Sequence, residues 1–446
     1  MRFRNCCSIK GVVLALALSA TSAKLSAEGH VWTLPECIHY ALLNNPDIKV
    51  QELTYKDKEI DYNTEQKGWL PKISGTSTQS FTFGRSLTAE NTYANTSTRQ
   101  TTLSVSGEIN LFDGFRRHYG MKMARELMRK EEYLLSLAKL DLSMKVAEAY
   151  MQVLLGMESV GINSEQVKID SLQASRLNYF FRQGKASYVD VSQQQATLHN
   201  SIAKLTESLN RLRLDRLTLC QLMNLDYSEN ISVAKFNEES LGKMMPATPE
   251  AIYENALKVY PEIMSQKAAI YSSENKIRAL RADYFPQLSL VGGVGTNYYK
   301  TNGYENGSLS DQLKNNFSQE IQLQLTVPIF NRFVTRNNIR KATLEKAANE
   351  IRLRKSEQEL FKSISQVYVR AMNAYSQIES CSKAVESSKD AFKLVTKKYE
   401  CGKATLVEFD DSKNKLQKSL SARIQAVFEY IYQCHLLHLF QHRPIS

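Results

Sequence analysis

The chain lacks any internal run of apolar residues long enough to span a membrane as a helix, which needs roughly 20 residues. Its longest such run, Gly11–Ala20, lies near the N-terminus behind Arg2, Arg4 and Lys10. A basic start, a short apolar stretch and following small residues are typical of a signal peptide, so we expect residues 1–27 to be removed on export. A mature chain without an apolar helix can cross lipid only as a closed barrel of strands.

Cysteines are few and form no recognisable framework. Cys6 and Cys7 precede the apolar run, so neither can be the lipid-bearing cysteine of a lipoprotein, and we expect no lipidation. The five others are odd in number and contain no Cys-x-x-Cys pair. Cys434, His438 and His442 recur every four residues on the last predicted helix, a spacing that could gather metal ligands. We favour ordinary positions near a frayed helix end and expect no metal and no cofactor.

Motifs of catalysis are also missing. We find no Gly-rich phosphate loop, no nucleophile elbow and no HExxH, so we expect no enzyme. The formal net charge is +11, and the three basic residues of the signal peptide contribute part of it. The remaining excess is spread over amphipathic helices, which fits solvated helix faces better than nucleic-acid binding.

The chain is instead rich in internal repetition. Gly184-Lys185-Ala186 recurs 218 residues later as Gly402-Lys403-Ala404, and Ala41-Leu42 recurs 215 residues later as Ala256-Leu257. So small a drift indicates duplication of one structural unit. We assign residues 28–225 to the first repeat, 226–247 to a linker and 248–446 to the second repeat.

Each repeat contains two segments of alternating polar and apolar residues. We predict strands at residues 72–84, 99–112, 286–299 and 317–330, each long enough to cross a bilayer when tilted. Aromatic residues mark one end of every strand, as in Trp69-Leu70-Pro71 and Tyr284-Phe285-Pro286, and this favours a lipid–water interface. Four strands cannot close a membrane barrel, so other copies of the chain must supply the rest.

Long helical patterns follow the strand pairs. Heptad spacing over about 70 residues leads to Gly184 and to Gly402, which end these helices in the manner of left-handed glycines. Ser187 and Thr405 then begin the returning helices with capping boxes. We expect a shorter helix at 34–68 and another at 249–283 to stack end to end with the returning arms, giving an antiparallel coiled-coil tube.

At this point the chain resembles the TolC-like outer-membrane efflux protein family over essentially its whole mature length. The resemblance rests on the duplication, on the aromatic-x-Pro strand starts, on the strand exits Leu111-Phe112-Asp113-Gly114 and Ile329-Phe330-Asn331, and on the hairpin tips. It implies a mainly α fold with a β-barrel part. A homotrimer would share one 12-stranded outer-membrane barrel, four strands per protomer, surrounded by outer-membrane lipid and continuing into a periplasmic α-helical barrel.

The resemblance further implies a function and partners. The protein would be the passive exit duct of a tripartite pump or type I secretion system in the outer membrane of a Gram-negative bacterium. Its partners would be a periplasmic adaptor and an inner-membrane pump of the RND, ABC or MFS type. The cargo stays open, because pump and adaptor would select it.

Individual residues acquire expected roles from this resemblance. Glu408 and Asp411 match the pore-facing acidic positions of the gate, and Tyr399 with Asp190 matches a lock between hairpins; an arginine that often reinforces that lock is Ala404 here. The adaptor-docking tips would be Gly184, Lys185, Ala186, Ser187, Gly402, Lys403, Ala404 and Thr405. Asp190 and Glu408 also fit a purely structural role as capping residues.

A second interpretation needs no transport. The helices alone would suit a structural coiled-coil protein of the cell envelope, which would dissolve without detergent. Strand pairs with a lipid-type apolar face and aromatic rims favour the duct.

Overall fold

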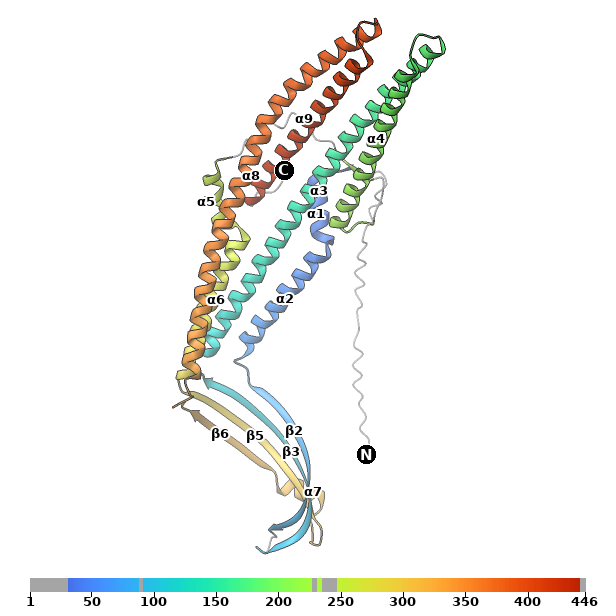
Figure 1. Cartoon of the computed structure of the whole chain (residues 1–446). Helices are drawn as coiled ribbons and strands as arrows, with labels where there is room; N and C mark the ends of the chain where they lie inside the picture. Colours follow the sequence, from blue (N-terminus) through green and yellow to red (C-terminus); the bar gives the residue numbers. More distant parts are fainter. Residues whose placement is uncertain (1–30, 88–90, 227–230, 235–246, 442–446) are drawn as a thin grey trace, which may run out of the picture.

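The structure, a computed structural model, describes residues 31–87, 91–226, 231–234 and 247–441. The predicted signal peptide, most of the predicted linker and His442 lie outside these residues. The chain is strongly elongated, with a sheet at one end and two helical hairpin tips at the other (Figure 1). No described helix is both long and apolar enough to cross a membrane.

One antiparallel sheet of four strands forms the first end. Its strands are β2 (Lys72–Leu87), β3 (Tyr93–Phe112), β5 (Gln287–Thr301) and β6 (Ser318–Thr326), in the order β2-β3-β5-β6. Each repeat therefore contributes one adjacent pair of strands. β6 ends four residues before the predicted boundary, just ahead of Pro328, which has no N–H to donate to a ladder.

The strand register places apolar residues together on one face. Val105 faces Val294, Ile109 faces Leu290, and Leu290 in turn faces Leu323. The opposite face carries polar rows, such as Lys72 beside Glu108. This division is that of a membrane barrel, whose outer face is apolar and whose lumen is polar.

Two helices of 67 residues run from the sheet to the hairpin tips: α3 (Arg116–Arg182) and α8 (Val334–Glu400). At 1.5 Å per residue each spans about 100 Å. They return through α4 (Tyr188–Met223) and α9 (Leu406–Phe440). The heptad seams are fully buried at mid-length, where Val146, Val153, Ile364 and Ala371 have no exposed surface, and are more open toward the tips, where Phe181 is 41% exposed.

Each shorter helix is split in two, where one continuous helix was predicted. α1 (Leu34–Asn44) is followed by α2 (Pro46–Lys67), and α5 (Pro249–Val259) by α6 (Pro261–Arg281), which the one-turn 3-10 helix η2 (Ala282–Tyr284) extends. The break falls before a proline in both repeats, because proline disfavours helical backbone at the residue that precedes it.

The helices lie in the same order as the strands. α2 and α4 pack on α3, α3 packs on α6 and α9, and these pack on α8 (Figure 1). One edge of the molecule thus consists of β2, α2 and α4, and the other of β6 and α8.

At mid-length β1 (Val31–Trp32) pairs with β4 (Ser232–Val233), and the hydroxyl of Tyr150 donates to the carbonyls of Trp32 and Ala234.

A short helix, α7 (Leu309–Asn315), folds back in the loop between β5 and β6, where only a loop was expected. Gln312 accepts a hydrogen bond from the N–H of Tyr299 and donates one to its carbonyl. This side-chain amide takes the place of a strand along the part of β5 that extends beyond β6.

Candidate functional site at the hairpin tips

The two tips have the same backbone geometry. Gly184 and Gly402 both have φ +70°, in the left-handed region that glycine adopts without strain. Lys185 N–H donates to the carbonyl of Phe180, and Lys403 N–H to that of Lys398, which completes a Schellman motif in each. A Cβ at either glycine would meet nothing within 4 Å, so the turn itself requires glycine.

Capping boxes begin both returning helices, as predicted. Ser187 N–H donates to the Asp190 carboxylate at 3.4 Å, and Thr405 N–H to the Glu408 carboxylate at 2.8 Å. Both acidic side chains are therefore engaged in local structure within one chain. Lys185 and Lys403 are exposed beside them, while Ala186 and Ala404 are half-buried in the turns.

Glu408 and Asp411 share the exposed face of α9. Asp411 pairs with Lys415 at 2.7 Å, and both side chains are more than half exposed. The neighbouring face of the helix is buried at Phe409 and Ser412. The two carboxylates therefore project away from their own hairpin.

The environment of Tyr399 differs from the prediction. Gln173 of α3 donates a hydrogen bond of 2.6 Å to its hydroxyl, and Phe409 stacks 5.2 Å from its ring. Burial raises the pKa of the Tyr399 hydroxyl, and nearby Asp190 adds to that shift. Among the described residues the expected pairing of Tyr399 with Asp190 is not made by a hydrogen bond, because the Asp190 carboxylate caps its own helix and Gln173 binds the Tyr399 hydroxyl.

The strongest polar contact between the hairpins involves residues that the sequence did not single out. Lys413 of α9 forms a buried ion pair with Asp170 of α3, and the side chains are only 2% and 1% exposed. Lys413 also pairs with Asp410 at 2.8 Å. Gln166 donates to Asp170 at 3.1 Å. One ammonium group thus bridges two carboxylates, of which Asp170 is buried and Asp410 is 18% exposed.

Further polar contacts join the same pair of hairpins. Gln417 donates to Asn163 at 2.9 Å, and Arg176 lies 3.6 Å from Glu400. We call the four contacts between the repeats the inter-hairpin ladder: Asn163–Gln417, Asp170–Lys413, Gln173–Tyr399 and Arg176–Glu400. It connects the distal part of α3 to both arms of the second hairpin.

A sequence signal for part of this ladder did exist. Asn163 and Asp170 occupy heptad seam positions, which are normally apolar. A polar residue at a seam position indicates a polar partner across the interface. The heptad pattern could not indicate which helix supplies that partner.

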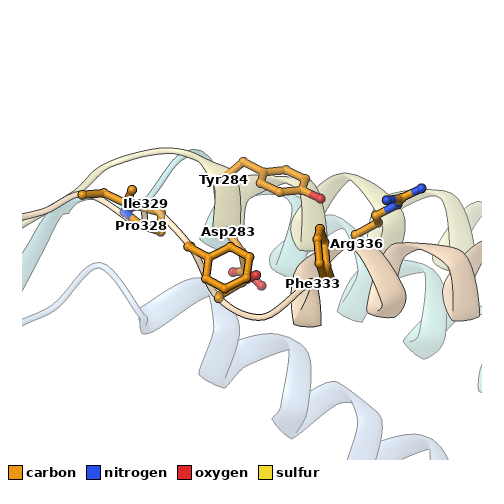
Figure 2. Close-up of a pocket in the computed structure, with 8 residues that line it drawn as sticks. Asp283, Tyr284, Pro328, Ile329, Phe333 and Arg336 are labelled. Atoms are coloured by element: carbon orange, nitrogen blue, oxygen red, sulfur yellow. The ribbon is translucent and has the colours of Figure 1, made fainter.

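The other end of the helices is built around aromatic residues. Phe112 and Phe115 pack edge to face at 5.6 Å, and so do Phe330 and Phe333 of the second repeat. Figure 2 shows Tyr284, Phe333 and Arg336 around a pocket of about 270 Å³ where β6 joins α8. These residues lie at the helix-side rim of the sheet, where an aromatic belt was predicted.

Of the three candidate metal ligands, Cys434 and His438 lie on α9 and His442 lies outside the described residues. Cys434 is buried, which raises the pKa of its thiol to about 11. The described residues contain no group of three or more His, Cys, Asp or Glu side chains that could hold a metal ion.

Comparison with known proteins agrees with this architecture. The sequence profile of the outer membrane efflux protein family matches residues 37–225 and 252–430, one match in each repeat. The chain belongs to this family. It is 23% identical over 405 residues to a probable efflux pump outer membrane protein, TtgC, of Pseudomonas putida, covering 89% of this chain and 80% of that one.

Two other relatives extend the comparison. The cation efflux system protein CusC of Escherichia coli is 21% identical over 405 residues, covering 89% of this chain and 82% of the relative. The crystal structure of the Campylobacter jejuni CmeC outer membrane channel superposes with a TM-score of 0.78 at 17% identity, over 92% of this chain and 85% of that one. This outer membrane efflux protein therefore has the fold of an outer-membrane channel, placed in the outer membrane of a Gram-negative bacterium.

Proposed function

We propose that the protein is the exit duct of a tripartite efflux pump or type I secretion system and conducts its cargo passively through a trimeric channel. The observation that carries this proposal is that both edges of the four-stranded sheet are unpaired. A membrane strand must satisfy its backbone groups, and an isolated open sheet leaves β2 and β6 unsatisfied. Three copies, each joining its β6 to the β2 of the next, would close a 12-stranded barrel.

The helical edges support the same ring. Apolar side chains stand exposed along α2 at Val50, Leu53 and Ile60, and along α8 at Leu344 and Ile351. Each of the five is more than 60% exposed. In a closed ring α8 of one copy would pack against α2 and α4 of the next and would cover these stripes. The interface would be heterologous, and a rotation of one third of a turn between neighbouring copies would close the ring.

Within this ring Glu408 and Asp411 would form the gate. They project from the exposed face of α9 close to the second tip, so three copies would place six carboxylates around the mouth. Such a mouth favours cations and binds divalent ions. Tyr399 and Asp190 would act nearby, with Tyr399 held by Gln173 as part of the inter-hairpin ladder.

The tips themselves would dock the periplasmic adaptor. Gly184–Ser187 and Gly402–Thr405 are exposed turns of equal geometry, each presenting one lysine. Six such turns at one end of the ring would offer a repeated surface to an adaptor that in turn holds an inner-membrane pump of the RND, ABC or MFS class. No step in this scheme requires the protein to catalyse a reaction.

The decisive experiment combines two measurements on detergent-purified protein. Its mass should be that of three chains, and in a planar bilayer it should form small, cation-selective channels that divalent ions block. A monomer, or a protein that does not insert, would overturn the shared barrel and favour the structural coiled-coil protein of the envelope.

A further inference from the structure

The outer rim of the sheet carries positive charge that the channel function does not use. Arg99 of β3 and Lys300 of β5 face each other directly in the strand register. Like charges opposite one another destabilise a sheet. Neither side chain takes part in an ion pair among the described residues, and both are exposed. Two adjacent unpaired cations indicate an anion that lies outside the protein.

These cations belong to the apolar face of the sheet. Arg99 lies six residues from Val105 on β3, and Lys300 lies six residues from Val294 on β5. An even spacing along a strand places the side chains on the same face of the sheet, which here is the face of Val105 and Val294. The hydrogen bond from Thr101 to Gln79, at 2.7 Å, lies on the same side and shows that the alternation continues outwards. The two basic groups therefore point toward lipid and away from the lumen.

Their depth matches one boundary of a bilayer. Arg99 stands ten residues beyond Ile109, and Ile109 lies near the helix-side rim of the apolar band. Ten residues at about 3.3 Å along a strand tilted by roughly 40° rise about 25 Å, which is the height of the apolar band of such barrels. The cations thus lie at the interface opposite the helices, on the outer side of the membrane.

An aromatic ring completes the site. Phe81 of β2 is the register partner of Arg99, and the guanidinium lies 5.9 Å from its ring centre. Phe81, Arg99 and Lys300 form a single row across three strands, which we call the cation row. Farther out on the same hairpin Arg85 lies 5.6 Å from the ring of Tyr93. Aromatic rings at an interface insert beside acyl chains, while arginine and lysine reach phosphate groups at the same level.

We propose that the cation row binds the phosphate of a phosphorylated glycolipid of the outer leaflet, with Arg99 and Lys300 on the phosphate and Phe81 against the sugar–acyl boundary. The inference depends on the membrane barrel and is independent of the adaptor, pump or cargo. Each protomer would hold one such lipid, so the oligomer would carry a ring of them.

The test is a native mass spectrometry titration of the detergent-purified oligomer with monophosphorylated lipid A. The Arg99→Gln/Lys300→Gln variant should bind about 30-fold more weakly, since each basic residue at an anionic lipid surface contributes about 1 kcal/mol. A control with the same loss of charge, Lys393→Gln/Lys397→Gln on an exposed part of α8, should bind as the wild type does. If the double variant does not assemble, Lys300→Gln alone should still weaken binding by about fivefold.

Several results would overturn the proposal. Unchanged affinity in the double variant would remove the cation row from lipid binding. Equal binding of the dephosphorylated glycolipid would show that the phosphate is not recognised. Displacement by inorganic phosphate at the same concentration as the lipid would assign the row to a free anion.

Discussion

Replacing Lys413 by methionine should open the channel. Lys413 lies between Asp170 and Asp410, and its loss leaves two carboxylates close together with no cation. Methionine keeps most of the side-chain volume, so packing changes little and the electrostatic effect is isolated. A carboxylate left without its cation is relieved by taking up a proton or by a separation of the hairpins that admits water, and the second route opens the channel.

The magnitude follows from the burial of this pair. Removing one partner of a buried ion pair costs about 3–5 kcal/mol, and here both side chains are at most 2% exposed. If the closed arrangement of the hairpins, in which the site is dry, is destabilised by about 4 kcal/mol, the equilibrium between closed and open channels shifts toward the open channel by roughly a thousandfold. Asp170→Asn should shift the equilibrium between closed and open channels less, because Lys413 keeps Asp410 as a partner. A loss of about 1–2 kcal/mol corresponds to a shift of that equilibrium by roughly tenfold.

The assay is single-channel recording in planar bilayers, with the oligomer checked by its mass. We expect the conductance or open fraction to increase in the order wild type, Asp170→Asn, Lys413→Met. The double variant Asp170→Leu/Lys413→Met should return part of the way toward the wild type, since an apolar pair of similar size replaces the buried ion pair at little cost while the partly exposed Asp410 stays without a cation. Lys418→Met, an exposed lysine five residues away on the same helix, is the matched control.

Two outcomes would refute this reasoning. Assembled Lys413→Met channels with wild-type conductance would show that the ladder does not hold the hairpins together. A larger effect of Asp170→Asn than of Lys413→Met would contradict the argument that one ammonium group bridges two carboxylates.

Three further predictions concern other positions. Changing Glu408 and Asp411 to alanine should raise conductance and reduce divalent block, and unchanged recordings would remove both residues from the gate. Reversing the charge of Lys185 and Lys403 should weaken cross-linking to the adaptor while the oligomer still assembles; normal cross-linking would place docking elsewhere. Burial lowers the pKa of His435 from 6.5 to about 4 in the folded protein. Between these two pH values the unfolded chain binds a proton that the folded chain does not bind. The free energy of unfolding should therefore fall by roughly 3 kcal/mol as the pH drops from about 6.5 to 4. His435→Leu should flatten that dependence, and an equally steep decline would assign it to other groups.

Much of the fold could be predicted because its signals are local and repeated. The burial of a seam residue such as Val146 or Ile364 is predicted by apolar residues that recur at alternating intervals of three and four positions. This spacing occurs in both repeats. The tip glycines follow from helix C-terminal chemistry, which depends on only a few neighbouring residues. Strand alternation likewise predicted the apolar face of the sheet.

Contacts between distant elements could not be predicted in the same way. The sequence marks Asp170 as an unusual seam residue, but its partner Lys413 lies 243 positions away and no local pattern connects them. α7 was missed for a related reason. Its role is to cover the outer part of β5 through Gln312, and that requirement exists only because β6 is shorter than β5.

The duplication also explains why the ladder lies where it does. With the offset of 218 residues, Asp170 corresponds to Ser388 and Lys413 to Gln195, while Tyr399 corresponds to Phe181. In the proposed ring, α8 of one copy would meet α4 of the next in the way that α3 meets α9 within a copy. The contact between α3 and α9 inside a protomer therefore includes an ion pair. The corresponding contact between protomers, Ser388 with Gln195, would join neutral side chains. Such divergence makes the two contacts chemically different, because only the contact inside a protomer depends on the pairing of charged groups. In the proposed ring, a change confined to Asp170 and Lys413 would therefore act on the contact inside each protomer and leave the residues between protomers unchanged.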